Sequence, residues 1–291
     1  MNPPPYQPPP EGKNPIVRQV LLASLIALPV VALIAFTVAY AVVAHRKTAQ
    51  TRAAWDDIAS SSKQMQANYK KNFDPKKGIT NADFAASVEF RSKLEDASQK
   101  LSGDDSVLAR VGAEYVGRLQ AAATNYQIAA GKMREAHVLD NFDSSNKAQI
   151  QTRREIVRDF MDANTALKQT VIGSEEKMRA DLTAANVKTA TIDAYLQAFH
   201  STAAPRNALI IRIRQCDDRV ANTTLDVLST LETNWGRWEA DPSTNKIRFK
   251  DHATYVTYTD DLATIKATGG EQLKLQGMLV NLPIQSPQPT P

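Results

Sequence analysis

The stretch VLLASLIALPVVALIAFTVAYAVVA, residues 20–44, separates a short Pro-rich tail from a long polar region and so decides how the chain is organised. Its 25 residues carry no charge, and Ser24, Thr37 and Tyr40 are the only polar interruptions. Because a helix rises about 1.5 Å per residue, such a stretch can cross a hydrocarbon core of about 30 Å. We therefore predict a single transmembrane helix over residues 16–45.

Two alternatives compete with a membrane span. A buried core helix rarely runs this far without a charge. A cleaved signal peptide has an apolar region of about 7–15 residues that ends in a small-residue site, whereas Arg46 and Lys47 directly follow the apolar run here. An uncleaved signal anchor is the favoured interpretation, and the lipid bilayer is the first partner that it implies.

The flanking charges leave the orientation of this span open. Two basic residues precede it, and four follow it within about 20 residues: Arg46, Lys47, Arg52 and Lys63. Counted literally, they place the C-terminal side in the cytoplasm, but long domains cross largely regardless of such charges. A short tail before a span and a large domain also fits an N-terminus that stays inside. We expect a single-pass protein of the plasma (inner) membrane with its large domain extracytoplasmic.

Composition excludes several classes of function. The chain has 35 Lys and Arg against 31 Asp and Glu, a net charge of +4, without a long block of one sign, so no nucleic acid partner is expected. The single cysteine, Cys216, excludes an intrachain disulfide framework and a cysteine-built metal site. Low glycine and aromatic contents are typical of long amphipathic helices.

Residues 46–282 are predicted to form one domain of long helices. Apolar residues recur every three or four positions, as they do from Leu108 to Met133, and give each helix a seam for a neighbour. The predicted fold class is all-α, an antiparallel bundle that is partly coiled-coil-like. The Pro-rich segments 1–15 and 283–291 are predicted to be disordered. Helices are expected over residues 46–72 (a stalk), 80–102, 105–138, 147–187, 189–200, 205–240 and 252–281.

Some polar residues within these helices are expected in an apolar seam and others on a solvated face. Asn164 lies in the apolar seam of its helix, where a polar side chain can fix the register of packing at a cost in stability. Asp217, Asp218 and Arg219 form a charged run that is typical of a solvated helix face. Cys216 falls on an apolar stripe, which indicates a small buried side chain rather than a nucleophile.

The segment WGRWEADPSTNKIRF, residues 235–249, interrupts the helical pattern. Asp-Pro-Ser-Thr-Asn is turn chemistry, and the alternation that follows it predicts a small β-hairpin near residues 237–250. Aromatic side chains at the tip of a bundle can form a ligand pocket or a partner contact; an apolar plug that closes the bundle end is the favoured alternative. The candidate contact residues are Trp235, Trp238, Phe249 and Tyr255.

No motif in the sequence names a reaction. The four histidines show no paired spacing, and neither HExxH nor a Gly-rich phosphate loop nor G-x-S-x-G occurs. We therefore expect no catalytic residue, no metal, no cofactor and no small-molecule substrate.

The expected function is that of a membrane-anchored, non-enzymatic interaction or scaffold module at the cell envelope, working through a protein partner or through self-association of its helices. The alternative is an extracytoplasmic sensor or ligand-binding bundle that works through a separate signalling partner. A pocket lined by the candidate aromatic residues would favour the alternative, whereas a solid core would favour scaffolding.

Overall fold

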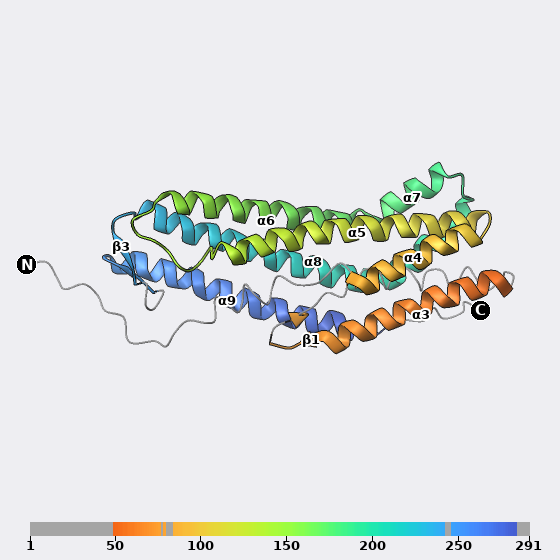
Figure 1. Ribbon diagram of the computed structural model, residues 1–291, viewed down its shortest axis with the longest axis horizontal. Helices are drawn as coiled ribbons and strands as arrows, with labels where there is room; N and C mark the ends of the chain where they lie inside the picture. Colours follow the sequence, from red (N-terminus) through yellow and green to blue (C-terminus); the bar gives the residue numbers. More distant parts are fainter. Residues whose placement is uncertain (1–48, 77, 80–83, 242–245, 284–291) are drawn as a thin grey trace, which may run out of the picture.

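The computed structural model describes residues 49–76, 78–79, 84–241 and 246–283, and these are mostly helical (Figure 1). The predicted all-α fold class is confirmed for them. The helices are α3 (Ala49–Asn72), α4 (Phe84–Lys100), α5 (Asp104–Glu135), α6 (Ala148–Ile172), α7 (Ser174–Ala184), α8 (Thr189–Thr233) and α9 (His252–Asn281). Two antiparallel hairpins pair β1 (Phe73–Asp74) with β2 (Gly78–Ile79), and β3 (Trp238–Asp241) with β4 (Lys246–Phe249).

The long helices lie side by side and alternate in direction (Figure 1). Helices α5 and α8 run parallel (Figure 1). Their starts lie together, and Thr191 at the start of α8 donates a hydrogen bond to Asp104 at the start of α5. Helix α6 runs antiparallel to α8, since Arg154 near its beginning pairs with Glu232 near the end of α8 at 2.6 Å. Hairpin β3–β4 lies at one end of the elongated bundle and α7 lies towards the other (Figure 1).

The core follows the predicted seams. In α5, the seam residues from Leu108 to Met133 are buried, as the 3–4 spacing predicts. In α4, Phe90 and Leu94 are buried, whereas Val88 is 57% exposed. Each fully buried large apolar side chain contributes about 1.5–3 kcal/mol to folding, so these seams supply most of the stabilising free energy.

Helix α3 packs against α4 and α9 through a regular seam. Trp55, Ile58, Ser62, Met65 and Tyr69 alternate by three and four residues and are all buried, which is the pattern of a coiled coil. After α3 the chain turns at Pro75 and Lys76 and forms the short β1–β2 hairpin, which the sequence pattern did not predict.

The C-terminal end of α9 is bound by two other helices. The buried guanidinium of Arg206 on α8 donates hydrogen bonds to the carbonyl oxygens of Leu282 at 3.3 Å and Pro283 at 2.9 Å. The Gln66 side chain of α3 donates to the same Leu282 oxygen at 2.6 Å. Terminal carbonyl groups that a helix leaves unpaired are satisfied in this way.

The predicted boundary between residues 200 and 205 is wrong, because α8 is one continuous helix of 45 residues with Pro205 inside it. Proline removes one hydrogen bond, but the residues on both sides keep their apolar stripe against neighbouring helices, and that packing outweighs the local cost. Helix α8 also ends at Thr233 rather than near 240, and the predicted hairpin that follows it is confirmed. Helix α9 continues without a break through Gly269 and Gly270.

The expected localisation requires correction. No helix among the described residues is both long and apolar enough to cross a membrane, so a single-pass membrane protein is not supported. The long described helices carry charges along their length; α8, for example, includes Arg212, Asp218 and Arg219. Residues 16–45, which carried the expectation, lie outside the described residues, as do segments 1–15 and 284–291.

Replacing Pro205 tests the continuity of α8. Pro205→Ala restores an amide that can donate to the Ser201 carbonyl, and we expect the free energy of unfolding to rise by about 1–3 kcal/mol. Ala208→Pro, at an exposed position of the same helix, should lower it by about 3 kcal/mol. Urea denaturation measures both variants. An unchanged or lower stability of Pro205→Ala would indicate a helix start at this position instead.

Candidate functional site

Four helices bring polar side chains to one buried level of the bundle. Tyr126 comes from α5, Asn164 from α6, Arg214 and Asp217 from α8, and Gln272 from α9, and each is at most 2% exposed. We call these five residues the polar layer. Such a layer is unusual inside a helical bundle, because burying polar groups is costly unless they are hydrogen-bonded to one another.

The Asp217 carboxylate lies at the centre of the polar layer. One of its oxygens, Oδ2, accepts a hydrogen bond from the Tyr126 hydroxyl at 3.1 Å and lies 3.1 Å from Nη2 of Arg214. The other oxygen, Oδ1, accepts a hydrogen bond from Nε2 of Gln272 at 2.8 Å. Three helices therefore meet at a single carboxylate.

Arg214 lies over the ring of Tyr126, with its guanidinium carbon 4.2 Å from the ring centroid. This contact adds a cation–π attraction to the ion pair with Asp217. Two guanidinium nitrogens, Nε and Nη1, have no hydrogen-bond partner among the described residues. The stability of the buried charge therefore depends on Asp217 and Tyr126.

A second carboxylate extends the polar layer towards the surface. Nδ2 of Asn164 donates to the Arg214 carbonyl at 2.9 Å and to Oδ1 of Asp218 at 2.6 Å. Lys168, one turn further along α6, donates to Oδ2 of Asp218 at 2.5 Å. The predicted role of Asn164 as a polar residue within a seam agrees with its position here.

Burial sets the titration behaviour of the layer. Desolvation raises the pKa of Asp217 to about 6, although the Arg214 charge and the bonds from Gln272 and Tyr126 act in the opposite direction. Burial also raises the pKa of the Tyr126 hydroxyl, which therefore stays protonated. Within the polar layer, the group whose pKa lies nearest to neutral pH is therefore Asp217.

The interpretation of Asp217 as part of a solvated face is wrong. Asp217 lies four residues after Ile213 and three before Val220, so it falls on the buried stripe of α8, whereas its neighbour Asp218 is partly exposed. The 3–4 spacing was the signal that could have located it. Cys216 is buried as expected, and burial raises the pKa of its thiol to about 11.

The four candidate aromatic residues gather at the hairpin end of the bundle. Trp238 and Phe249 are paired across β3 and β4, and both are buried. Trp235 meets Trp238 edge to face at 5.2 Å between ring centroids. Tyr255, in the first turn of α9, is partly buried and packs against the core.

Other rings and a backbone group complete this end. Phe142, from the α5–α6 loop, meets Trp238 edge to face at 6.3 Å, and Tyr258 meets Phe249 at 5.2 Å. The indole nitrogen of Trp238 donates to the Leu231 carbonyl at 2.8 Å. The aromatic side chains therefore pack against one another at the end of the bundle.

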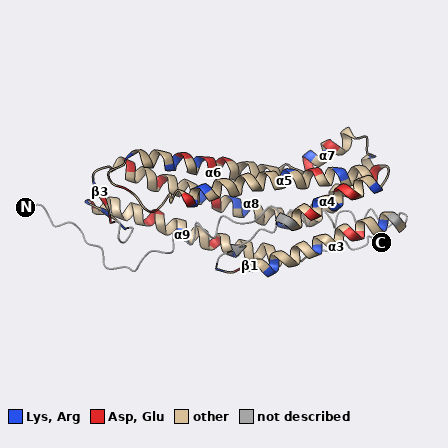
Figure 2. Cartoon of the chain, viewed as in Figure 1, with Lys and Arg blue, Asp and Glu red and all other residues tan. Residues whose placement is uncertain are grey.

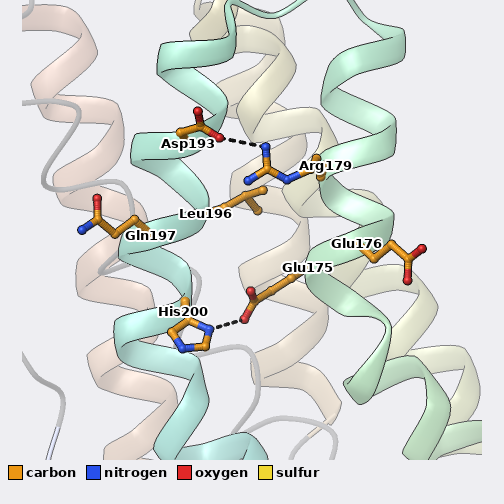
Figure 3. A pocket seen from close by; sticks show the side chains of 7 residues that line it. All are labelled: Glu175, Glu176, Arg179, Asp193, Leu196, Gln197 and His200. Carbon is orange, nitrogen blue, oxygen red and sulfur yellow. Dashed lines mark hydrogen bonds and ion pairs between the residues drawn. The ribbon is translucent and has the colours of Figure 1, made fainter.

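A surface hollow of about 400 Å³ lies between α7 and α8 (Figure 3). Two polar pairs cross it: an ion pair of Arg179 with Asp193 at 2.8 Å, and a hydrogen bond between Nδ1 of His200 and Glu175 at 2.8 Å. Leu196 forms its apolar part, and Glu176 points away from both pairs (Figure 3). The pairs are solvent-exposed, so each contributes at most about 1 kcal/mol.

The described side chains offer no candidate metal site. Within the described part of the chain, no group of three or more His, Cys, Asp and Glu side chains is placed to hold a metal ion. The chain matches no protein-family model, no curated protein and no solved structure.

A double-mutant cycle tests the ion pair of the polar layer. Arg214→Met or Asp217→Leu alone leaves one charge buried without its partner and should lower the free energy of unfolding by about 3–5 kcal/mol. The double variant removes both charges and should lie closer to wild type than either single variant. Urea denaturation at pH 7.5 gives the coupling energy; additive losses would show that the two charges do not depend on each other.

Two substitutions of Trp238 separate packing from hydrogen bonding. Trp238→Ala empties a buried site and should lower the free energy of unfolding by about 3–5 kcal/mol. Trp238→Phe keeps a ring but leaves the Leu231 carbonyl without its donor, and should cost about 1–3 kcal/mol. Thermal denaturation measures both, with Tyr255→Ala as a partly exposed control. A loss of less than about 1 kcal/mol in Trp238→Ala would contradict a packed bundle end.

Proposed function

We propose that this chain is a helical-bundle interaction module that binds a protein partner through its long outer faces and catalyses no reaction. The observation that carries this proposal is the packed aromatic end, where Trp235, Trp238 and Phe249 contact other rings. A cavity lined by these residues would instead have favoured a ligand-binding function.

The dimensions of the bundle support the same proposal. Helix α8 alone has 45 residues and so spans roughly 65 Å at about 1.5 Å per residue. Charges of both signs are interspersed over the visible faces of the helices (Figure 2). Such a surface offers long polar faces for protein contact rather than a single strongly charged patch.

Four exposed apolar side chains mark positions where a partner could bind: Val88 on α4, Ile128 on α5, Ile172 on α6 and Met278 on α9, each more than half exposed. Single exposed apolar residues are common on protein surfaces. They nevertheless provide specific positions for a test, because polar substitutions there should not disturb the core.

Site-specific photo-crosslinking in the native cell tests the proposal. A photoreactive phenylalanine analogue is placed at each of the four positions, and at exposed polar positions such as Glu114 and Gln151 as controls. We expect a discrete crosslinked protein, or a crosslinked dimer, from at least one apolar position and none from the controls. With the analogue moved to an exposed residue one turn away, a glutamate at the apolar position should abolish that crosslink without changing the thermal denaturation midpoint.

The opposite result would be equally informative. If no apolar position gives a discrete crosslink while the bundle is folded, the interaction proposal fails. The hollow between α7 and α8 would then become the first place to look for a ligand, because it is concave and lined by both charged and apolar side chains.

A further inference from the structure

Helix α9 carries a buried polar row that extends beyond the polar layer. Thr268, Gln272 and Gln276 follow one another at intervals of four residues, so they lie on one face of the helix, and all are at most 3% exposed. Gln276 is 0% exposed, and neither its amide oxygen nor its amide nitrogen has a hydrogen-bond partner among the described residues. An unsatisfied buried amide of this kind costs about 1–3 kcal/mol.

The direction of the bond between Asp217 and Gln272 depends on the charge of the carboxyl group. An ionised carboxylate can only accept, so Gln272 presents its Nε2 donor to Oδ1 of Asp217, as observed at 2.8 Å. A proton on Oδ1 turns that oxygen into a donor. The Gln272 amide must then rotate to present Oε1, which turns Nε2 away from Asp217.

We propose that the polar layer is an acid-responsive lock: proton uptake by Asp217 reverses its hydrogen bond to Gln272 and extends a hydrogen-bonded relay along α9 to Gln276. In the protonated state, Asp217 donates to Oε1 of Gln272, and Nε2 of Gln272 donates to Oε1 of Gln276. The proton comes from solvent, and no covalent bond changes. Acidification therefore keeps the hydrogen bond between α8 and α9 with its direction reversed, and adds one hydrogen bond within α9 that satisfies the buried amide oxygen of Gln276.

The charged and titratable groups around Asp217 are compatible with this change. Tyr126 of α5 faces it as a neutral hydroxyl, and Lys168 of α6 is paired with Asp218. Arg214 keeps its charge, with the Tyr126 ring and the neighbouring Asp218 carboxylate as its remaining electrostatic partners. Glu271 of α9 lies on the solvent side and pairs with Arg219 at 3.1 Å.

The expected sign follows from the raised pKa of Asp217. Its folded-state value of about 6 exceeds the ordinary value of 3.8, so the folded chain binds this proton more tightly than the unfolded chain does. The contribution of Asp217 to stability is greatest below pH 4 and is lost as the pH rises through 6. Between these two pH values, the protonation of Asp217 lowers the equilibrium constant of unfolding by about tenfold for each pH unit of acidification.

Urea denaturation of the full-length chain at pH 7.5 and pH 5.0 tests the lock. We compare wild type with Asp217→Asn, which cannot titrate, and with Asp159→Asn, an exposed control on α6. From pH 7.5 to 5.0, the unfolding constant of wild type should fall about tenfold relative to that of Asp217→Asn. Asp159→Asn should follow wild type. Equal responses of wild type and Asp217→Asn would overturn the proposal.

A second variant tests the relay in case Asp217→Asn does not fold. Gln276→Leu removes the unsatisfied amide, so it should be more stable than wild type at pH 7.5. It also removes the end of the relay, so its response to acidification should be several-fold smaller than that of wild type. A variant that is less stable at pH 7.5, or that keeps the full pH response, would show that Gln276 takes no part.

Discussion

The need to satisfy one buried carboxylate constrains the rest of this bundle. Asp217 is removed from water, and its hydrogen bonds come from Tyr126 and Gln272 on two other helices, while Arg214 supplies the opposing charge from its own helix. Sliding α5 or α9 along α8 by one turn would break those hydrogen bonds and leave the buried carboxylate with Arg214 as its remaining partner, and each hydrogen bond lost at a buried polar group costs about 1–3 kcal/mol. The polar layer therefore selects one axial alignment of helices whose apolar seams alone would tolerate several.

Packing at the two ends of the bundle complements this central constraint. At the hairpin end, aromatic rings from α9, the hairpin and the α5–α6 loop pack against one another. Towards the opposite end, Arg206 and Gln66 bind the last carbonyl groups of α9. Helix α9 is thus attached at both ends and through the polar layer between them. Any change in the charge of Asp217 acts on the middle of this attached helix.

Local patterns predicted much of the fold because burial follows helical spacing. The seam of α5 and the β3–β4 hairpin were visible in the sequence, whereas the helix predicted over residues 147–187 is divided at Gly173 into α6 and α7. Pro205 misled the prediction, because its local cost is smaller than the gain from packing on both sides of it. The expected membrane localisation was wrong for the part of the chain that the structure describes, and the apolar stretch 20–44 lies outside that part.

By itself, the sequence determined the helical fold class and the positions that form the core, because apolar side chains spaced by three and four residues can be buried only on one face of a helix. Asn164 was identifiable as a polar residue within a seam for the same reason. The 3–4 spacing of α8 already places Asp217 on the apolar stripe, but only the tertiary structure decided that Tyr126, Asn164 and Gln272 meet it at the same level. Hydrogen bonds between residues 50 or more positions apart depend on the register of packed helices, which periodicity within one helix does not encode.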